Sequence, residues 1–155
     1  MQDWLLSQRP VDVVRELQLN ALDLLDQHQY RMAVIEARTS LEIAVDEALL
    51  SAMTAKGVEP RAASDILDCR PSLDATLRDV VDDAKIGKKL GRGCSEYLGI
   101  NPLNTSLGPK WRRAKQLRED ASHHGRIVNQ HEAVEAVELM SEMISLIRAS
   151  AARPA

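Results

Sequence analysis

Apolar residues recur every three or four positions along most of the chain, which is the spacing expected for one face of a helix. The first such repeat follows Pro10, a residue suited to a helix start. Its members are Val13, Val14, Leu17, Ala21, Leu24 and Leu25. A second repeat runs from about residue 30 to 56 and stops at Gly57, a favourable residue after a helix. Residues 27–29 form the only break between them, so we expect an antiparallel helical pair joined by a short turn.

The second half of the chain contains two further helical patterns. Pro109 suits the first turn of a helix that Gly125 should end. The next helix has a capping-box signal, because Glu132 follows Asn129 by three residues. The apolar faces of these two helices comprise Trp111, Ala114, Leu117, Ala121, Val134, Val137, Met140, Ile144 and Ile147.

The middle of the chain is less regular. Residues 59–71 predict a short helix closed by Pro71, and Ser72 can cap another helix that reaches Ala84. Residues 85–108 are rich in Gly, Pro, Asn and Ser, which predicts a loop-rich insertion. The last residues, about 150–155, are expected to be a disordered tail. The whole pattern predicts an all-α fold: one domain over residues 1–155, an up-and-down helical bundle of four to five main helices.

Composition narrows the class of protein further. Hydrophobic residues make up 45% and charged residues 28%, an ordinary balance for a soluble domain. There is no apolar run long enough for a transmembrane helix and no signal-peptide pattern. The two cysteines, Cys69 and Cys94, match no zinc or redox spacing. We therefore expect a cytoplasmic protein with reduced thiols that does not bind a membrane.

The small net charge of −3 conceals an asymmetry. Residues 85–126 contain 10 Lys and Arg against 3 Asp and Glu, a net charge of +7, whereas residues 1–84 contain 8 against 16, a net charge of −8. A basic segment within an acidic chain indicates either an anion or nucleic-acid surface or a solvated face that aids solubility. Aromatic residues are only 3%, so any contact with RNA should be to phosphates rather than by base stacking.

The segment QLREDASHHGRIVNQHEA, residues 116–133, carries the candidate chemistry. A histidine can accept the proton of a ribose 2′-hydroxyl near neutral pH, and an arginine can stabilise the charge that develops on the phosphate. Arg118 and His123 supply these two groups. On a straight helix, however, they would point about 140° apart. This angle argues against a shared site on one helix. The argument is weaker if the helix ends before His123, or if a two-fold axis brings two copies of each residue together.

LREDASHHG, followed by the amphipathic EAVEAVELM, resembles the R-x4-6-H signature of the HEPN superfamily. The segment YRMAVIEARTSLEIAVDEALL is similar to the alanine-rich second helix of that family. The resemblance implies a helical bundle that forms a homodimer and places two motifs across a shared cleft. Many members are metal-independent ribonucleases, acting as toxins of toxin–antitoxin pairs or in defence against phage. Others have lost catalysis and serve as interaction or nucleotide-binding modules.

By this resemblance, Arg118 and His123 are the catalytic residues, and Glu119, Asp120 and His124 are supporting residues. In the family, the position after the motif arginine is usually Asn, Asp or His, so Glu119 is a departure that adds negative charge where RNA would approach. The flanking basic residues would bind the RNA substrate or serve solubility. They are Lys110, Arg112, Arg113, Lys115 and Arg126.

Several alternatives remain open from the sequence. An antitoxin or another protein partner is possible, and Glu119 and Asp120 favour a non-catalytic interaction module. Glu42 could be a buried partner of Arg118 across the bundle. His123, His124 and His131 could be imagined as a metal site, but no Cys or well-spaced acid completes a familiar pattern, so we expect no metal and no cofactor.

Overall fold

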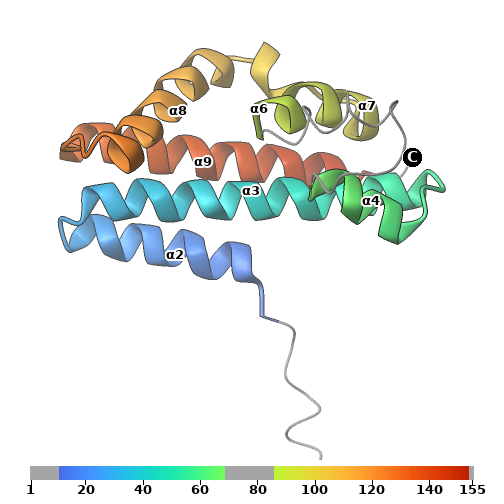
Figure 1. Ribbon diagram of the computed structural model, residues 1–155, viewed down its shortest axis with the longest axis horizontal. Coiled ribbons are helices and arrows are strands. Elements are labelled where there is room, and N and C mark those ends of the chain that lie inside the picture. Colours follow the sequence, from blue (N-terminus) through green and yellow to red (C-terminus); the bar gives the residue numbers. More distant parts are fainter. Residues whose placement is uncertain (1–10, 69–85, 154–155) are drawn as a thin grey trace, which may run out of the picture.

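The computed structural model describes residues 11–68 and 86–153, and every regular element within these two ranges is helical (Figure 1). The elements are α2 (Val13–Asp26), α3 (Tyr30–Ala55), α4 (Pro60–Leu67), α6 (Ile86–Lys88), a π-helical turn (Lys89–Gly93), α7 (Cys94–Leu98), a 3-10 turn (Pro102–Asn104), α8 (Leu107–His123) and α9 (Gln130–Ala151). The prediction of an all-α bundle is therefore confirmed. The helix expected from Ser72 to Ala84 and the remark on Cys69 lie outside the described residues.

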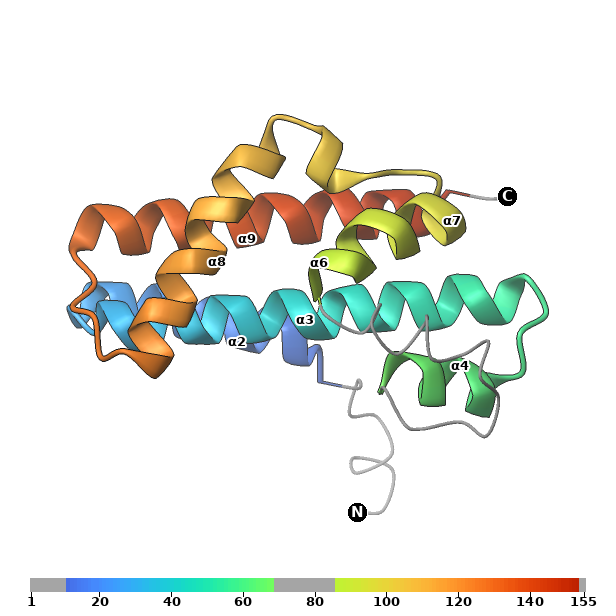
Figure 2. The ribbon, with the colours of Figure 1, turned by 45° about the horizontal axis from the view of Figure 1, so that its top comes forward.

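Helix α3 lies at the centre of the bundle, between α2 and α9. Helix α2 is antiparallel to α3, whereas α9 runs parallel to it, and α8 crosses α3 and α9 obliquely (Figures 1 and 2). Most of the largest fully buried side chains come from the three central helices; they include Val14, Leu41, Met140, Met143 and Ile147. Removing each such side chain from water stabilises the fold by about 1.5–3 kcal/mol. Between them lie the buried alanines of α3, whose small size lets α9 and α2 approach closely.

The turn between α2 and α3 lies where the sequence placed it. His28 has a positive φ of 60° at this turn, and its Nδ1 lies 2.8 Å from the hydroxyl oxygen of Tyr30. At the other end of α2, an Asp12 carboxylate oxygen accepts the backbone N–H of Arg15 at 3.1 Å. The same carboxylate accepts two hydrogen bonds from Arg148 of α9, at 2.8 and 3.0 Å. An ion pair thus holds the first turn of α2 against the end of α9.

The loop predicted for residues 85–108 is wrong for most of its length. Residues 86–98 are continuously helical, and residues 102–104 form a 3-10 turn. Leu90 and Cys94 are fully buried, and burial raises the pKa of the Cys94 thiol to about 12. Packing on α3 is close at Gly93, where an added Cβ would lie 3.1 Å from a Leu49 methyl carbon. This tertiary packing outweighs the weak helix propensity of the local sequence.

Both ends of the last helix can be compared with the sequence. The capping box is confirmed, since Asn129 accepts the Glu132 N–H at 3.0 Å and Glu132 accepts the Asn129 N–H at 3.2 Å. Helix α9 continues to Ala151, so the disordered tail does not begin at residue 150 as expected. Among the described helices, none is long and apolar enough to cross a membrane.

The start of α8 is packed directly on the 3-10 turn that precedes it. A Cβ at Gly108 would lie 2.0 Å from the carbonyl oxygen of Leu103, so only glycine fits at this position. Pro102, within the same turn, is fully buried. The backbone contact fixes where α8 begins and therefore which of its side chains face α3.

Candidate functional site

Helix α8 carries both residues of the R-x4-H pattern on one continuous helix. It extends through His123, and the His124 N–H still donates to the Asp120 carbonyl at 3.0 Å. The expectation that the helix ends before His123 is therefore wrong, and the two side chains leave the helix about 140° apart. Gly125 then ends the helix as predicted, with a φ of 64° that favours glycine. Arg118 is partly buried, whereas His123 and His124 are exposed.

Arg118 lies on the side of α8 that faces α3. It follows Trp111 by two helical turns, and Trp111 is only 3% exposed. Over the Trp111 ring lies the guanidinium carbon of Arg38, a residue of α3, at 4.4 Å from the ring centroid. This distance is within the range of a favourable cation–π contact. The α3–α8 junction therefore places Arg38 against a buried indole, with Arg118 near enough for its charge to act on Arg38.

Arg38 is a buried charge with one counterion. It is 6% exposed, and its Nε donates to a Glu42 carboxylate oxygen at 2.8 Å. Glu42 thus pairs with Arg38 on its own helix, and the cross-bundle partnership with Arg118 suggested by the sequence does not occur. Burial lowers the pKa of Arg38, and the nearby positive charge of Arg118 lowers it further, against the opposing effect of Glu42 and Glu119.

Two nitrogen atoms at this junction are buried without a hydrogen-bond partner: Nη1 of Arg38 and Nε of Arg118. Leaving a buried donor unpaired costs about 1–3 kcal/mol, more when the group is charged. Few folds keep such groups without a reason. Both atoms belong to cationic groups that can donate to an anion, but an anion would reach them only after neighbouring side chains move.

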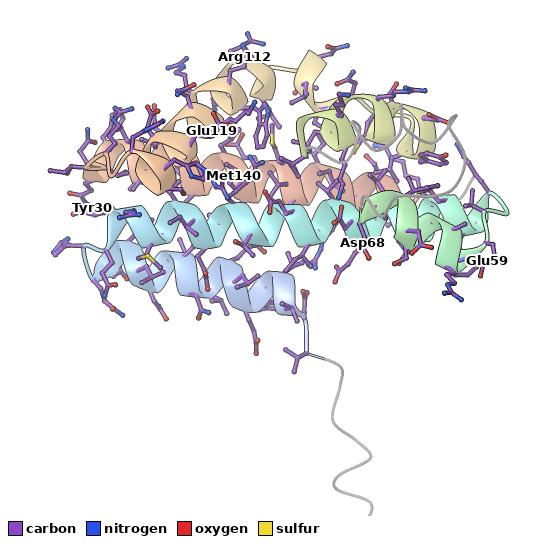
Figure 3. The ribbon with its side chains drawn as sticks, in the orientation of Figure 1. Tyr30, Glu59, Asp68, Arg112, Glu119 and Met140 are labelled. Atoms are coloured by element: carbon purple, nitrogen blue, oxygen red, sulfur yellow. The ribbon has the colours of Figure 1, made fainter. Side chains whose placement is uncertain are left out.

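The acidic residues after Arg118 have different surroundings. Glu119 lies 3.7 Å from the Lys115 ammonium, and its charge acts on Arg38. Figure 3 labels Glu119 on α8. Asp120 instead holds the α8–α9 turn: its carboxylate accepts hydrogen bonds from Gln116 at 2.8 Å and from Arg126 at 3.4 Å. Asp120 therefore supports the fold of the motif segment.

The basic residues predicted to bind RNA are mostly in ion pairs. Lys110 lies 4.0 Å from Glu142, and Arg126 bonds to Glu132 as well as to Asp120. Arg112 and Arg113 are exposed, and within the described chain no ion pair involves them. Figure 3 shows Arg112 at the outer surface of α8. The five side chains therefore differ in their surroundings: three lie in ion pairs, and two are exposed without one in the described chain.

A groove of about 470 Å³ lies between α8 and α9. One wall is basic and the other acidic, and neither Arg118 nor His123 is part of it. Its charged lining residues are Lys110, Arg113, Arg126, Glu132, Glu135, Glu138 and Glu142. The groove and the α3–α8 junction are thus two separate features on opposite edges of α8.

Sequence reasoning did not find Arg38. The available signal was its place within the apolar stripe of α3, where Ala37 and Leu41 flank a full charge. No group of three or more His, Cys, Asp or Glu residues that could hold a metal ion occurs in residues 11–68 and 86–153. Comparisons with protein families, with curated proteins and with solved structures found no match to this chain. The likeness to the HEPN superfamily therefore rests on the sequence motifs alone.

Proposed function

We propose that this chain is a metal-independent RNA endonuclease of the HEPN type that acts as a homodimer in the cytoplasm. The observation that carries the proposal is the buried Nε of Arg118, which has no hydrogen-bond partner and lies five residues before an exposed histidine on α8. A planar guanidinium that never loses its charge is well suited to phosphate oxygens. An exposed imidazole can reach a substrate and exchange protons near neutral pH.

The reaction follows from these two groups. The ribose 2′-oxygen attacks the adjacent phosphorus while the His123 imidazole accepts the 2′-hydroxyl proton. The bond between phosphorus and the 5′-oxygen breaks, and the leaving oxygen takes up a proton from a protonated histidine or from water. Arg118 stabilises the pentacoordinate transition state. The products are a 2′,3′-cyclic phosphate, or its hydrolysed form, and a 5′-hydroxyl end.

The angle between Arg118 and His123 favours a site that is shared between two chains. Because the two side chains leave one helix about 140° apart, a single chain does not direct both at one phosphate. A two-fold axis near the end of α8 would bring Arg118 of one chain to His123 of the other. The proposal therefore predicts an obligatory dimer.

A second candidate is a non-catalytic interaction module, and the α8–α9 groove favours it. This groove carries charges of both signs, as a surface for a protein partner does, and it contains neither motif residue. Its partner would be an antitoxin if the chain is the toxin of a toxin–antitoxin or phage-defence system. Glu119 also favours this candidate, because it adds negative charge beside Arg118.

Cleavage of varied RNAs in the presence of EDTA separates the two candidates. The wild type should cleave, while Arg118→Ala and His123→Ala should lose activity by at least about a hundredfold, the usual scale for an acid–base or electrostatic group. Arg31→Ala and His131→Ala are matched controls, since both replace exposed side chains of the same kind, on α3 and α9. A folded wild-type dimer that cleaves no RNA would refute the nuclease and favour the interaction module.

Mixing the two inactive variants tests the shared site. If Arg118 of one chain acts with His123 of the other, a random mixture of the two variants contains one intact site in half of its dimers. Such a mixture should recover about a quarter of wild-type activity. If the two residues acted within one chain, the mixture would stay inactive.

A further inference from the structure

The two guanidinium groups of the α3–α8 junction, Arg38 and Arg118, lie in the field of two carboxylates, Glu42 and Glu119. Glu42 is hydrogen-bonded to Arg38, whereas Glu119 is paired with the exposed Lys115. A phosphodiester that takes the place of Glu119 would leave the two guanidinium charges balanced. The two unpaired guanidinium donors would gain acceptors at the same time.

We propose that Arg38 and Arg118 together bind one phosphate group of the RNA, and that Glu119 is the side chain this phosphate displaces. The inference deepens the proposed function and rests on it, since it assigns the phosphate of that substrate to a pair of arginines from two helices. It adds Arg38, on α3, to a motif that the sequence confines to α8.

Arg38 is fixed before any ligand arrives. Its Nε is held by Glu42 at 2.8 Å, and its guanidinium lies over Trp111 at 4.4 Å, so the direction of Nη1 is set by two independent contacts. A side chain already held in its binding orientation loses little conformational entropy when a ligand binds. A buried charge is a poor way to stabilise a core, because an apolar side chain of similar size does as well or better. Arg38 is thus better explained by binding than by packing.

Glu119 is the group that must move. Its only ion pair in the described chain is with Lys115 at 3.7 Å, and the two side chains are 42% and 53% exposed. Exposed pairs at this distance contribute little, so Glu119 can turn towards solvent at small cost. While it faces the arginines, its carboxylate competes with phosphate. The residue that departs from the HEPN pattern thereby becomes an electrostatic regulator of phosphate binding.

The test measures binding separately from cleavage. The probe is a fluorescein-labelled oligoribonucleotide that is fully 2′-O-methylated, so it has phosphates but no 2′-hydroxyl nucleophile. Its affinity for the full chain is measured by fluorescence anisotropy. Arg38→Ala should weaken binding by at least about tenfold, the loss of a charged hydrogen bond, and Arg38→Lys should recover part of the loss. Arg31→Ala replaces an exposed arginine seven positions earlier on α3; it is the matched control and should change affinity by less than about threefold.

Glu119→Gln should change the affinity for the probe in the opposite direction. It also keeps the proposal testable if Arg38→Ala fails to fold. Removing the competing carboxylate should tighten binding by several-fold, whereas a purely structural role for Glu119 predicts no gain. Trp111 gives an independent readout in a Trp4→Phe background, where it is the sole tryptophan. Because its ring lies under Arg38, probe binding should change its fluorescence in the wild type and not in Arg38→Ala.

The proposal is wrong if Arg38→Ala and Arg31→Ala lose affinity equally, if Glu119→Gln binds no more tightly than the wild type, or if the wild type does not bind the probe. Arg38-dependent binding without any cleavage of ordinary RNA would refute the nuclease and leave the phosphate site intact. Cleavage that does not depend on Arg38 would support the nuclease and refute the phosphate site at Arg38.

Discussion

Two arginines of this bundle each pair with a carboxylate, but one arginine is exposed to solvent and the other is buried. Arg148 is 41% exposed and makes two hydrogen bonds to Asp12, at 2.8 and 3.0 Å. Arg38 has a side chain only 7% exposed, makes a single bond to Glu42, and keeps a buried nitrogen without a partner. The exposed pair has the better geometry and holds two helix ends together. The buried pair has incomplete bonding, which the proposed phosphate contact would complete.

Removing Glu42 should give the largest effect on stability. Glu42→Ala leaves Arg38 buried without its counterion, which costs about 3–5 kcal/mol for a fully buried pair. Since the Glu42 side chain is 43% exposed, we expect a loss of about 2–3 kcal/mol in the free energy of unfolding, measured by urea denaturation. A loss below about 1 kcal/mol would show that water already solvates Arg38.

Replacing Arg38 itself should cost much less. Arg38→Met keeps the volume, removes the unpaired donor, and leaves Glu42 free to be solvated, although the contact with Trp111 is lost. Removing the unpaired donor stabilises the fold and losing the Trp111 contact destabilises it, each by about 1–2 kcal/mol. The free energy of unfolding should therefore stay within about 1 kcal/mol of the wild-type value. The same urea titration measures it. If Arg38→Met were as damaging as Glu42→Ala, Arg38 would be a structural residue.

The exposed ion pair of Asp12 and Arg148 should contribute still less to the free energy of unfolding, and its contribution should depend on pH. The Arg148 guanidinium, together with the Arg15 amide, lowers the pKa of Asp12 to about 2 from an ordinary value of 3.8. The stability it contributes is therefore complete above about pH 4, decreases as the pH falls from 4 to 2, and is absent below 2. Because both side chains are exposed, we expect less than about 1 kcal/mol.

Asp12→Asn isolates this contribution. Asparagine still accepts the Arg15 N–H as a helix cap, so the change removes the charge and one of the two hydrogen bonds from Arg148. The difference in Tm between wild type and variant should be small at pH 6 and should vanish near pH 2. A difference that persists unchanged to pH 2 would contradict the role of this ion pair.

Added salt should change the stability least, but it should distinguish the exposed ion pair from the buried one most clearly. At 1 M NaCl the screening length is about 3 Å, so the few tenths of a kcal/mol lost in Asp12→Asn should disappear. The loss in Glu42→Ala should change little, because its partner is buried away from the ions. Urea denaturation of both variants at 0.1 and 1 M NaCl measures this. Equal salt sensitivity would mean that the two pairs are equally solvated.

The sequence predicted the parts of the fold in which local pattern and packing agree. The break at His28, the glycine that ends α8 and the capping box at Asn129 all follow from residue types acting within a few positions. The segment from residue 86 to 104 was mistaken for a loop, because its glycines weaken helix propensity. Its helical structure depends on burial of Leu90 and Cys94, which no local pattern reveals.

The candidate site was predictable only where it lies on one helix. Arg118 and His123 share a motif, so spacing identified them, and their divergence on a continuous helix followed from its geometry. Arg38 belongs to the site because α8 crosses α3 at that level, with Trp111 against its guanidinium. A helix–helix crossing is a property of the whole bundle, and a charged residue in an apolar stripe does not say what will cover it.

The close contact at Gly108 also determines where insertions or deletions would change the position of Arg118. Gly108 and Arg118 are ten positions apart on one helix, so a single insertion between them would rotate Arg118 by about 100° away from Arg38. Insertions after Gly125 or around Gly57 would leave that alignment untouched. A search for distant relatives should therefore hold the interval from Gly108 to Arg118 fixed and allow gaps elsewhere. Chains that keep the interval, with an arginine in the α3 stripe, would be the first to compare for shared activity.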